Sequence, residues 1–134
     1  MSEARRKLIH TGSALAPLVV WLFPRGVSLA ILGGLLATAV MVEIARRRVP
    51  RLRERFLALT GEMLRPHERE RLTGATYMAA AYFLAALLFP RPVAVAAMLY
   101  NAFGDTAAAL VGRAWGRHRA GWGKSYEGLL AGFL

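Results

Sequence analysis

The sequence predicts an all-α fold: a polytopic transmembrane helical bundle with four complete spans and the start of a fifth. Of the 134 residues, 56% are hydrophobic and a further 13 are glycine, yet the formal net charge is +10. A soluble domain of this size buries too little of its surface to hide so much apolar material. Disordered chains are excluded because they need low hydrophobicity, and the lack of cysteine excludes disulfide scaffolds, thiolate metal sites and cysteine nucleophiles. Residues 1–134 are therefore expected to form a single integral membrane domain.

Charged residues or prolines separate the apolar stretches from one another. The first is not expected to be a cleavable signal peptide, because Pro17 interrupts it and no A-x-A-like site precedes the next stretch. The two short turns between stretches look alike, but we find no convincing internal repeat. Each complete stretch is close to the roughly 17–25 residues that cross the hydrocarbon core. These stretches are residues 8–23, 27–45, 73–89 and 93–111, and an incomplete one opens near Glu127.

The basic residues are distributed unequally between alternate loops. Of the 18 Lys and Arg side chains, only Arg25 and Arg91 fall on one predicted side of the membrane, at the short turns. The positive-inside rule then places the amino terminus and both long loops in the cytoplasm, the one at residues 46–72 and the one that contains residues 113–124. The Ala- and Arg-rich composition suggests a prokaryotic plasma membrane. Nucleic-acid binding is not expected, because the basic residues lie at membrane boundaries and not on one folded face.

The long loop at residues 46–72 contains a candidate interfacial helix. Pro50 can begin such a helix, Gly61 weakens it and Pro66 ends it. An amphipathic helix of this kind lies on a membrane surface. The arginines of this loop are explained equally well as solvent-exposed charges that only determine which side of the membrane the loop occupies. The apolar side of the predicted helix consists of Leu52, Phe56, Leu59 and Met63.

Asp105 is the most informative residue, because it lies inside the apolar stretch at residues 93–111. An unpaired carboxylate at the bilayer centre costs about 2.5–3.5 kcal/mol on the least severe scales, so it must face a polar cavity, a cation or a basic partner. Asn101 precedes it by four residues and shares its helical face. We interpret the two as functional, and the alternative is a structural ion pair or a snorkelling Asp105.

Small residues recur every four positions around Asp105 and form a smooth stripe. Such a stripe lets a second helix approach closely. Packing explains the stripe without any function. It consists of Gly104, Ala108, Gly112 and Gly116.

The segment after this stretch offers groups that suit a phosphate. Gly123-Lys124-Ser125 ends like a P-loop, but the pattern requires glycine where the chain has His118. Gly123 frees backbone N–H groups for an anion, Lys124 adds charge and Ser125 a hydroxyl. The alternative is that Ser125 caps a helix and Lys124 only sets topology. With Asn101, these three are the expected nucleotide-binding residues.

Two carboxylates near this basic segment are suited to a divalent cation on a nucleotide. Glu127 lies one turn into the helix after Lys124, and with Asp105 it is expected to hold Mg²⁺. His10 follows three basic residues and has a pKa suited to a general base toward a lipid hydroxyl; the alternative is an ordinary interfacial histidine. The scattered histidines, including His67 and His118, make no zinc site and look like surface residues. Glu43 is expected to form an i,i+4 ion pair with Arg47.

Four motifs in this order resemble the CTP-dependent lipid kinases: dolichol and polyprenol kinases, phytol kinases and the fungal-type diacylglycerol kinase. That family is similar to the phosphatidate cytidylyltransferases. The resemblance extends over nearly the whole chain. The motifs are Arg6-Lys7-x-x-His10, Leu72-Thr-Gly-Ala-Thr-Tyr77, Gly104-Asp105-x-x-Ala108-x-x-x-Gly112-x-x-x-Gly116 and Gly123-Lys124-Ser125-x-Glu127-Gly128.

The resemblance implies a helical membrane enzyme that transfers the γ-phosphate of CTP to a lipid alcohol with Mg²⁺. Matched by motif position, Asp105 and Glu127 bind metal or nucleotide, Lys124 and Ser125 contact phosphates, and His10 lies near the acceptor hydroxyl. The expected catalytic residues are thus Asp105, Lys124, Glu127 and His10, beside the nucleotide-binding residues named above. CTP as donor comes from the resemblance alone, and the residues do not specify whether the acceptor is a polyprenol, phytol or diacylglycerol.

The chain departs from the family in one respect, because it ends two turns after Glu127 while family members continue through further hydrophobic helices. It is thus expected to be an N-terminal portion of a longer fold, or to complete its site with another subunit, as in a homo-oligomer. Two other functions stay open. One is CMP transfer to phosphatidate by the same machinery, and the other is a non-catalytic membrane protein in which Asp105 forms a structural ion pair.

Overall fold

The computed structural model describes residues 12–61, 64, 71–118 and 124–133. Within these ranges the regular structure is α-helical and no β-strand occurs, so the predicted all-α fold is confirmed. The helices are α2 (Leu15–Leu22), α3 (Arg25–Arg48), α4 (Pro50–Thr60), α5 (Gly74–Leu88), α6 (Arg91–Ala114) and α7 (Tyr126–Phe133).

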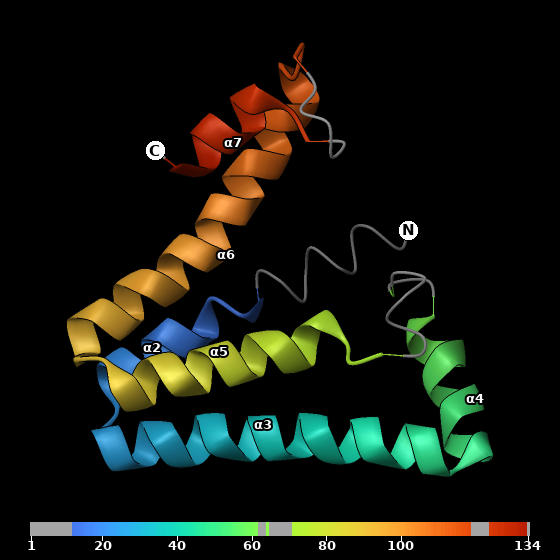
Figure 1. Cartoon of the computed structure of the whole chain (residues 1–134). Helices are drawn as coiled ribbons and strands as arrows, with labels where there is room; N and C mark the ends of the chain where they lie inside the picture. The colour runs from blue at the N-terminus through green and yellow to red at the C-terminus, as the bar shows by residue number, and fades with distance from the viewer. Residues whose placement is uncertain (1–11, 62–63, 65–70, 119–123, 134) are drawn as a thin grey trace.

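The helices form two hairpins joined by a connection that contains α4. α3 and α5 lie side by side, and the α2–α3 and α5–α6 turns meet at one end of the molecule, on the left of Figure 1. We call this the turn end. α4 begins at the opposite end of α3, and α6 rises away from α3 and α5 with α7 packed along its far half.

α3 and α6 are candidate membrane spans. Each has 24 residues and is apolar enough to cross a membrane, and only 17% of its apolar window is buried. A core helix of a soluble domain would be mostly buried, so the low burial of α3 and α6 distinguishes them from such a helix. Of the four predicted spans, these two reach the required length; α5 is apolar but has 15 residues, and α2 has eight.

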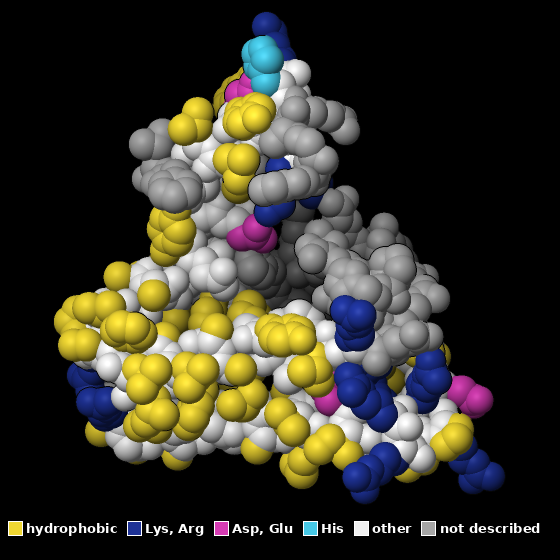
Figure 2. Space-filling view, in the orientation of Figure 1, with side chains coloured by type: hydrophobic (Ala, Val, Ile, Leu, Met, Phe, Trp, Pro, Cys, Tyr) yellow, Lys and Arg dark blue, Asp and Glu magenta, His cyan; other side chains and the backbone are white. Residues whose placement is uncertain are grey.

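Apolar and basic side chains occupy different parts of the surface. Figure 2 shows hydrophobic side chains over the middle of the α3–α5 layer and basic side chains at both of its ends. Large apolar side chains along α3 are exposed, among them Leu35, Met41 and Ile44. This distribution favours a hydrocarbon environment around the middle of the helices and water at their ends.

Proline fixes both hairpin turns. Pro24 and Pro90 directly precede α3 and α6, with φ angles of −55° and −58°. Because a residue before proline avoids the helical region, Phe23 and Phe89 are extended, with ψ angles of 154° and 155°, and α2 and α5 end there.

The two hairpins share a residue pattern at their turns and the same helix pairing, which the sequence analysis did not recognise; we call this the hairpin repeat. Residues 23–28 (Phe-Pro-Arg-Gly-Val-Ser) occupy the first turn and residues 89–94 (Phe-Pro-Arg-Pro-Val-Ala) the second, and the helices that follow are equally long. α2 packs on α6 and α3 packs on α5, so the first helix of each hairpin lies on the second helix of the other. An approximate twofold axis between the hairpins would produce this arrangement.

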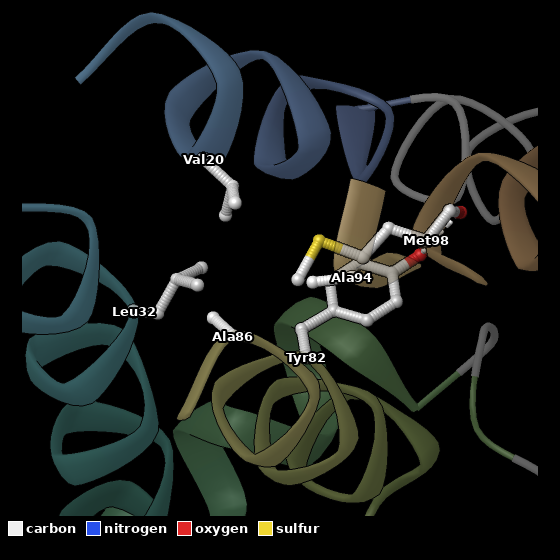
Figure 3. Close-up of a cluster of buried hydrophobic side chains, with 6 residues drawn as sticks. All are labelled: Val20, Leu32, Tyr82, Ala86, Ala94 and Met98. Carbon is white, nitrogen blue, oxygen red and sulfur yellow. Dashed lines mark hydrogen bonds between the residues drawn. The ribbon is translucent and has the colours of Figure 1, made fainter. Parts of the chain in front are cut away.

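The apolar core lies near the turn end, between the hairpins. Its side chains point toward one another from α2, α3, α5 and α6 (Figure 3). Several members occupy equivalent positions of the repeat: Val20 corresponds to Ala86, and Leu32 to Met98. The cluster consists of Val20, Leu32, Tyr82, Ala86, Ala94 and Met98.

A buried polar cluster joins α3 to α5 at the end away from the turns. Glu43 and Arg46 are each 3% exposed and form an ion pair of 2.5 Å between Oε2 and Nη2. The other carboxylate oxygen of Glu43 accepts hydrogen bonds from the Thr73 N–H (2.8 Å) and the Thr76 hydroxyl (3.3 Å). We call Glu43, Arg46, Thr73 and Thr76 the Glu43 clamp. The partner of Glu43 is therefore Arg46, and the predicted pair with Arg47 is wrong.

The clamp also explains the position of α4. Arg46 donates a hydrogen bond to the Arg71 carbonyl and lies over the Phe56 ring, 5.1 Å from its centroid. The predicted helix from Pro50 is confirmed, and it ends at Thr60. Leu52 and Leu59 are exposed, which suits an apolar side laid on a membrane surface. Met63 lies outside the described residues.

Candidate functional site

Asp105 continues the buried face of α6. At 100° per residue, Asp105 lies about 20° around the helix from Ala94, and Asn101 about 20° on the other side. Ala94 and Met98 point into the core. Because α6 rises away from the other helices beyond this point, Asp105 and Asn101 are exposed although they lie on the inward face.

A tyrosine from α5 fixes Asn101. The Asn101 side-chain amide donates a hydrogen bond of 3.1 Å to the hydroxyl of Tyr82, which in turn donates to the Met98 carbonyl at 3.4 Å. Tyr82 is 6% exposed and belongs to the core cluster, so the amide is held by a rigid partner. The side-chain amide oxygen of Asn101 belongs to the same helical face as the Asp105 carboxylate. Two oxygen ligands one helical turn apart suit a hard cation such as Mg²⁺.

The stripe of small residues receives α7, as predicted. A Cβ on Gly104 would lie 3.1 Å from the Gly132 carbonyl oxygen, and one on Gly112 would lie 3.6 Å from the Gly128 Cα. The two helices therefore meet backbone to backbone and run antiparallel. The first residues of α7 lie near the far end of α6.

Replacing Gly128 by alanine is expected to separate these helices. Its Cβ would lie 2.7 Å from the Ala108 carbonyl oxygen and 3.0 Å from the Gly112 Cα, both backbone atoms that cannot move aside. We expect the free energy of unfolding to fall by about 1–3 kcal/mol, measured by thermal unfolding in detergent micelles. Gly34→Ala is the matched control, because nothing lies within 4 Å of its Cβ. An equal effect of both substitutions would contradict the close contact.

Ser125 caps α7. Its Oγ accepts a hydrogen bond of 3.1 Å from the Gly128 N–H, three residues later. This is the N-cap geometry that satisfies an orphan amide of the first turn, so the capping alternative for Ser125 is confirmed. The neighbouring Lys124 is exposed at the same helix terminus.

Glu127 pairs with His118, a residue that the sequence analysis treated as a surface histidine. Its Oε1 lies 2.8 Å from His118 Nδ1 and accepts a hydrogen bond of 3.2 Å from the His118 N–H. The His118 ring, followed by nearby backbone N–H groups, lowers the pKa of Glu127 to about 2. Glu127 Oε2 is buried without a hydrogen-bond partner among the residues that the structure describes.

The His118 contact predicts a measurable titration of Glu127. A carboxyl whose pKa falls from 4.5 to about 2 stabilises the fold fully above pH 4.5, and this contribution disappears as the pH drops through 2. His118→Ala is expected to move the pKa of Glu127 back toward 4.5, followed by ¹³C NMR of labelled glutamate in micelles. Glu54→Gln, in exposed α4, removes one competing signal and serves as the assignment control. An unchanged titration of Glu127 in His118→Ala would contradict the assigned cause.

The two predicted metal ligands lie at different levels of α6. Gly104, beside Asp105, faces Gly132 near the end of α7, whereas the start of α7 faces Gly112. Seven residues of helix separate these levels, a rise of about 10 Å, while Mg²⁺ binds oxygen at about 2.0–2.1 Å. To share a Mg²⁺ ion, the side chains of Asp105 and Glu127 would have to bridge this rise. No group of three or more acidic or histidine side chains that could hold a metal occurs in the described ranges.

Two of the predicted site residues, His10 and Gly123, lie outside the described residues. Two described residues of this region were missed by sequence reasoning. Tyr82 looked like one more apolar position of its helix, and His118 lies nine residues from Glu127 with no regular spacing between them. Only the Gly-rich segment between His118 and Glu127 indicated that the chain could fold back there.

Comparisons with known proteins do not identify a family. No family model matches the chain, and no solved structure matches it. The chain is similar to a protein of Rickettsia prowazekii (strain Madrid E) that is described as the uncharacterized protein RP860, with 24% identity over 135 residues. The match covers 98% of this chain and 66% of the relative, so this chain spans slightly less than two thirds of the relative's length.

Proposed function

We propose that the chain is an integral membrane protein whose amino terminus and α4 side face the cytoplasm. Support comes from the two 24-residue apolar helices, from the exposed apolar side chains along them, and from the basic residues at both ends. The larger number of basic residues at the α4 end favours this orientation under the positive-inside rule. The membrane is proposed to be a prokaryotic plasma membrane, on composition alone.

Within that membrane, we propose that the protein is a CTP-dependent kinase that transfers the γ-phosphate to a lipid alcohol. The observation that carries this proposal is the position of Asp105 and Asn101. They continue the inward face of a candidate span at the point where that face becomes exposed. A lipid substrate has access to such a position from the bilayer, and a carboxylate there has no role in apolar packing. CTP as the donor follows from the motif resemblance.

The chain's own residues would bind and orient the donor. Asp105 and the Asn101 oxygen have the donor chemistry for Mg²⁺, which would neutralise phosphate oxygens when bound. Lys124 and the first N–H groups of α7 offer positive charge for phosphates at the other end of the α6–α7 contact. Most of the rate enhancement would come from positioning and charge neutralisation. A base such as His10 would draw the proton from the acceptor hydroxyl.

The position of the transferred label tests the proposal. The purified chain is reconstituted with a mixed lipid extract and incubated in parallel with α-labelled and γ-labelled CTP. Label from the γ position alone is the expected result, and the mobility of the product identifies the class of lipid alcohol. Label from the α position alone would show a cytidylyltransferase instead. Transfer of neither label would contradict an enzymatic function of this chain.

A further inference from the structure

Two arginines lie at the turn end, one in each hairpin, and each donates a hydrogen bond to the other hairpin. Arg25, in α3, donates from Nη2 to the Leu87 carbonyl of α5 at 2.6 Å. Arg91, the equivalent residue of the repeat, donates from Nη2 to the Phe23 carbonyl at the end of α2, at 3.2 Å. The last carbonyls of a helix lack intrahelical partners, so each arginine satisfies one of them. Each guanidinium has five N–H donors, so this contact leaves others for a ligand.

The residues on either side of the two turns carry positive charge and no carboxylate. The sequence contains no Asp or Glu between residues 4 and 42, nor between residues 71 and 104, and these ranges include both turns. α3 and α6 both begin here, so the positive ends of their dipoles add to the two arginines. Neither helix has an acidic residue in its first turn. The turn end therefore attracts an anion.

A cavity of about 240 Å³ opens between the two arginines. Its wall is mostly apolar and includes Val20, Leu29 and Phe89. Ser28 also lines it, but the Ser28 hydroxyl is occupied by the carbonyls of Val19 (3.1 Å) and Phe23 (3.3 Å). A ligand in this cavity would thus meet guanidinium groups at one side and hydrocarbon at the other.

We propose that this cavity binds an anionic phospholipid, with its phosphate on Arg25 and Arg91 and the first carbons of its chains on the apolar wall. Arginine suits phosphate because its planar N–H groups bind two oxygens at once. The apolar wall and the exposed apolar helices beside the cavity favour a lipid over a free phosphate ion. The site lies at the opposite end of α6 from α7, and it does not depend on the proposed kinase activity.

Tryptophan quenching tests the proposal, because Trp21 is exposed beside the cavity residue Val20. In a variant with Trp115 and Trp122 replaced by Phe, Trp21 is the single reporter. The protein is titrated in micelles with brominated phosphatidylglycerol or brominated phosphatidylcholine. We expect Trp21 to be quenched at a lower mole fraction of phosphatidylglycerol, by about tenfold, the effect of one or two charge-assisted hydrogen bonds.

The arginine variants make the test specific. Arg25→Gln/Arg91→Gln is expected to abolish the preference for phosphatidylglycerol, while Arg47→Gln/Arg48→Gln, at the other end of α3, keeps it. If the double variant does not fold, Arg91→Gln alone, which removes the longer hydrogen bond, is expected to lower the preference. Equal quenching by both lipids in the parent protein, or an unchanged preference in the arginine variants, would overturn the proposal. Displacement of the lipid by millimolar inorganic phosphate would show a small-anion site instead.

Discussion

Asp105→Asn is expected to lower the rate of phosphate transfer from CTP by at least about 100-fold, more than the loss of an outer-shell partner of a metal ligand. The substitution keeps the size of the side chain and removes its charge. If Asp105 neutralises the donor's charge through a cation, the amide cannot replace it. The transfer of γ-label to lipid in reconstituted vesicles measures the effect. The unfolding temperature of the Asp105→Asn variant is expected to equal that of the parent protein.

Glu54→Gln is the control for this experiment, because it removes a carboxylate from the exposed surface of α4. It is expected to leave transfer unchanged. A rate of transfer that stays undiminished in Asp105→Asn would remove Asp105 from the proposed mechanism. A lowered unfolding temperature in Asp105→Asn, with no transfer in the parent protein, would support the non-catalytic alternative in which Asp105 forms a structural ion pair.

Glu43→Ala is expected to lower the free energy of unfolding by about 3–5 kcal/mol, the cost of removing one partner from a buried ion pair. Arg46 would keep its charge at a position that is 3% exposed, and the Thr73 N–H and Thr76 hydroxyl would lose their acceptor. Unfolding of the micellar protein by SDS, followed by tryptophan fluorescence, gives the value.

A double-mutant cycle separates the ion pair from the rest of the Glu43 clamp. Arg46→Ala alone is also expected to be destabilising, because it leaves the Glu43 carboxylate buried and frees the Arg71 carbonyl. In Glu43→Ala/Arg46→Ala neither charge is left unpaired, so the loss is expected to be smaller than the sum of the two single losses. Glu54→Ala, on the surface, should change stability by less than about 0.5 kcal/mol. Additive losses would show that the two side chains act independently.

The helices themselves could be predicted because apolar length and proline define them locally. The apolar stretch at residues 73–89 became α5, and that at residues 93–111 became the middle of α6. The stripe containing Gly104 and Gly112 also predicted a close helix contact correctly, since only small residues allow one. Such features depend on neighbours within a few turns of the same helix.

Features that depend on three-dimensional neighbours could not be predicted in this way. Glu43 has basic residues at both three and four positions ahead, and only the start of α5, thirty residues later, selects Arg46 by burying it with Thr73. The repeat was missed because its halves share residues at the turn but not along the helices. The pairing of Glu127 with His118 likewise depends on how the chain folds back after α6.

The polar contacts between helices are distributed unequally, and this affects which part of the molecule can tilt. Polar contacts join α3 to α5 at both ends, through Arg25 and through the Glu43 clamp. The hydrogen bonds described between α6 and the α2 and α5 segments involve Arg91, Met98 and Asn101, all in the first half of α6. The second half of α6 is about 18 Å long, so a tilt of about 10° near Ala102 displaces its tip by about 3 Å. Because Asp105 and α7 both lie on the outer half of α6, such a tilt would move them together relative to α3 and α5.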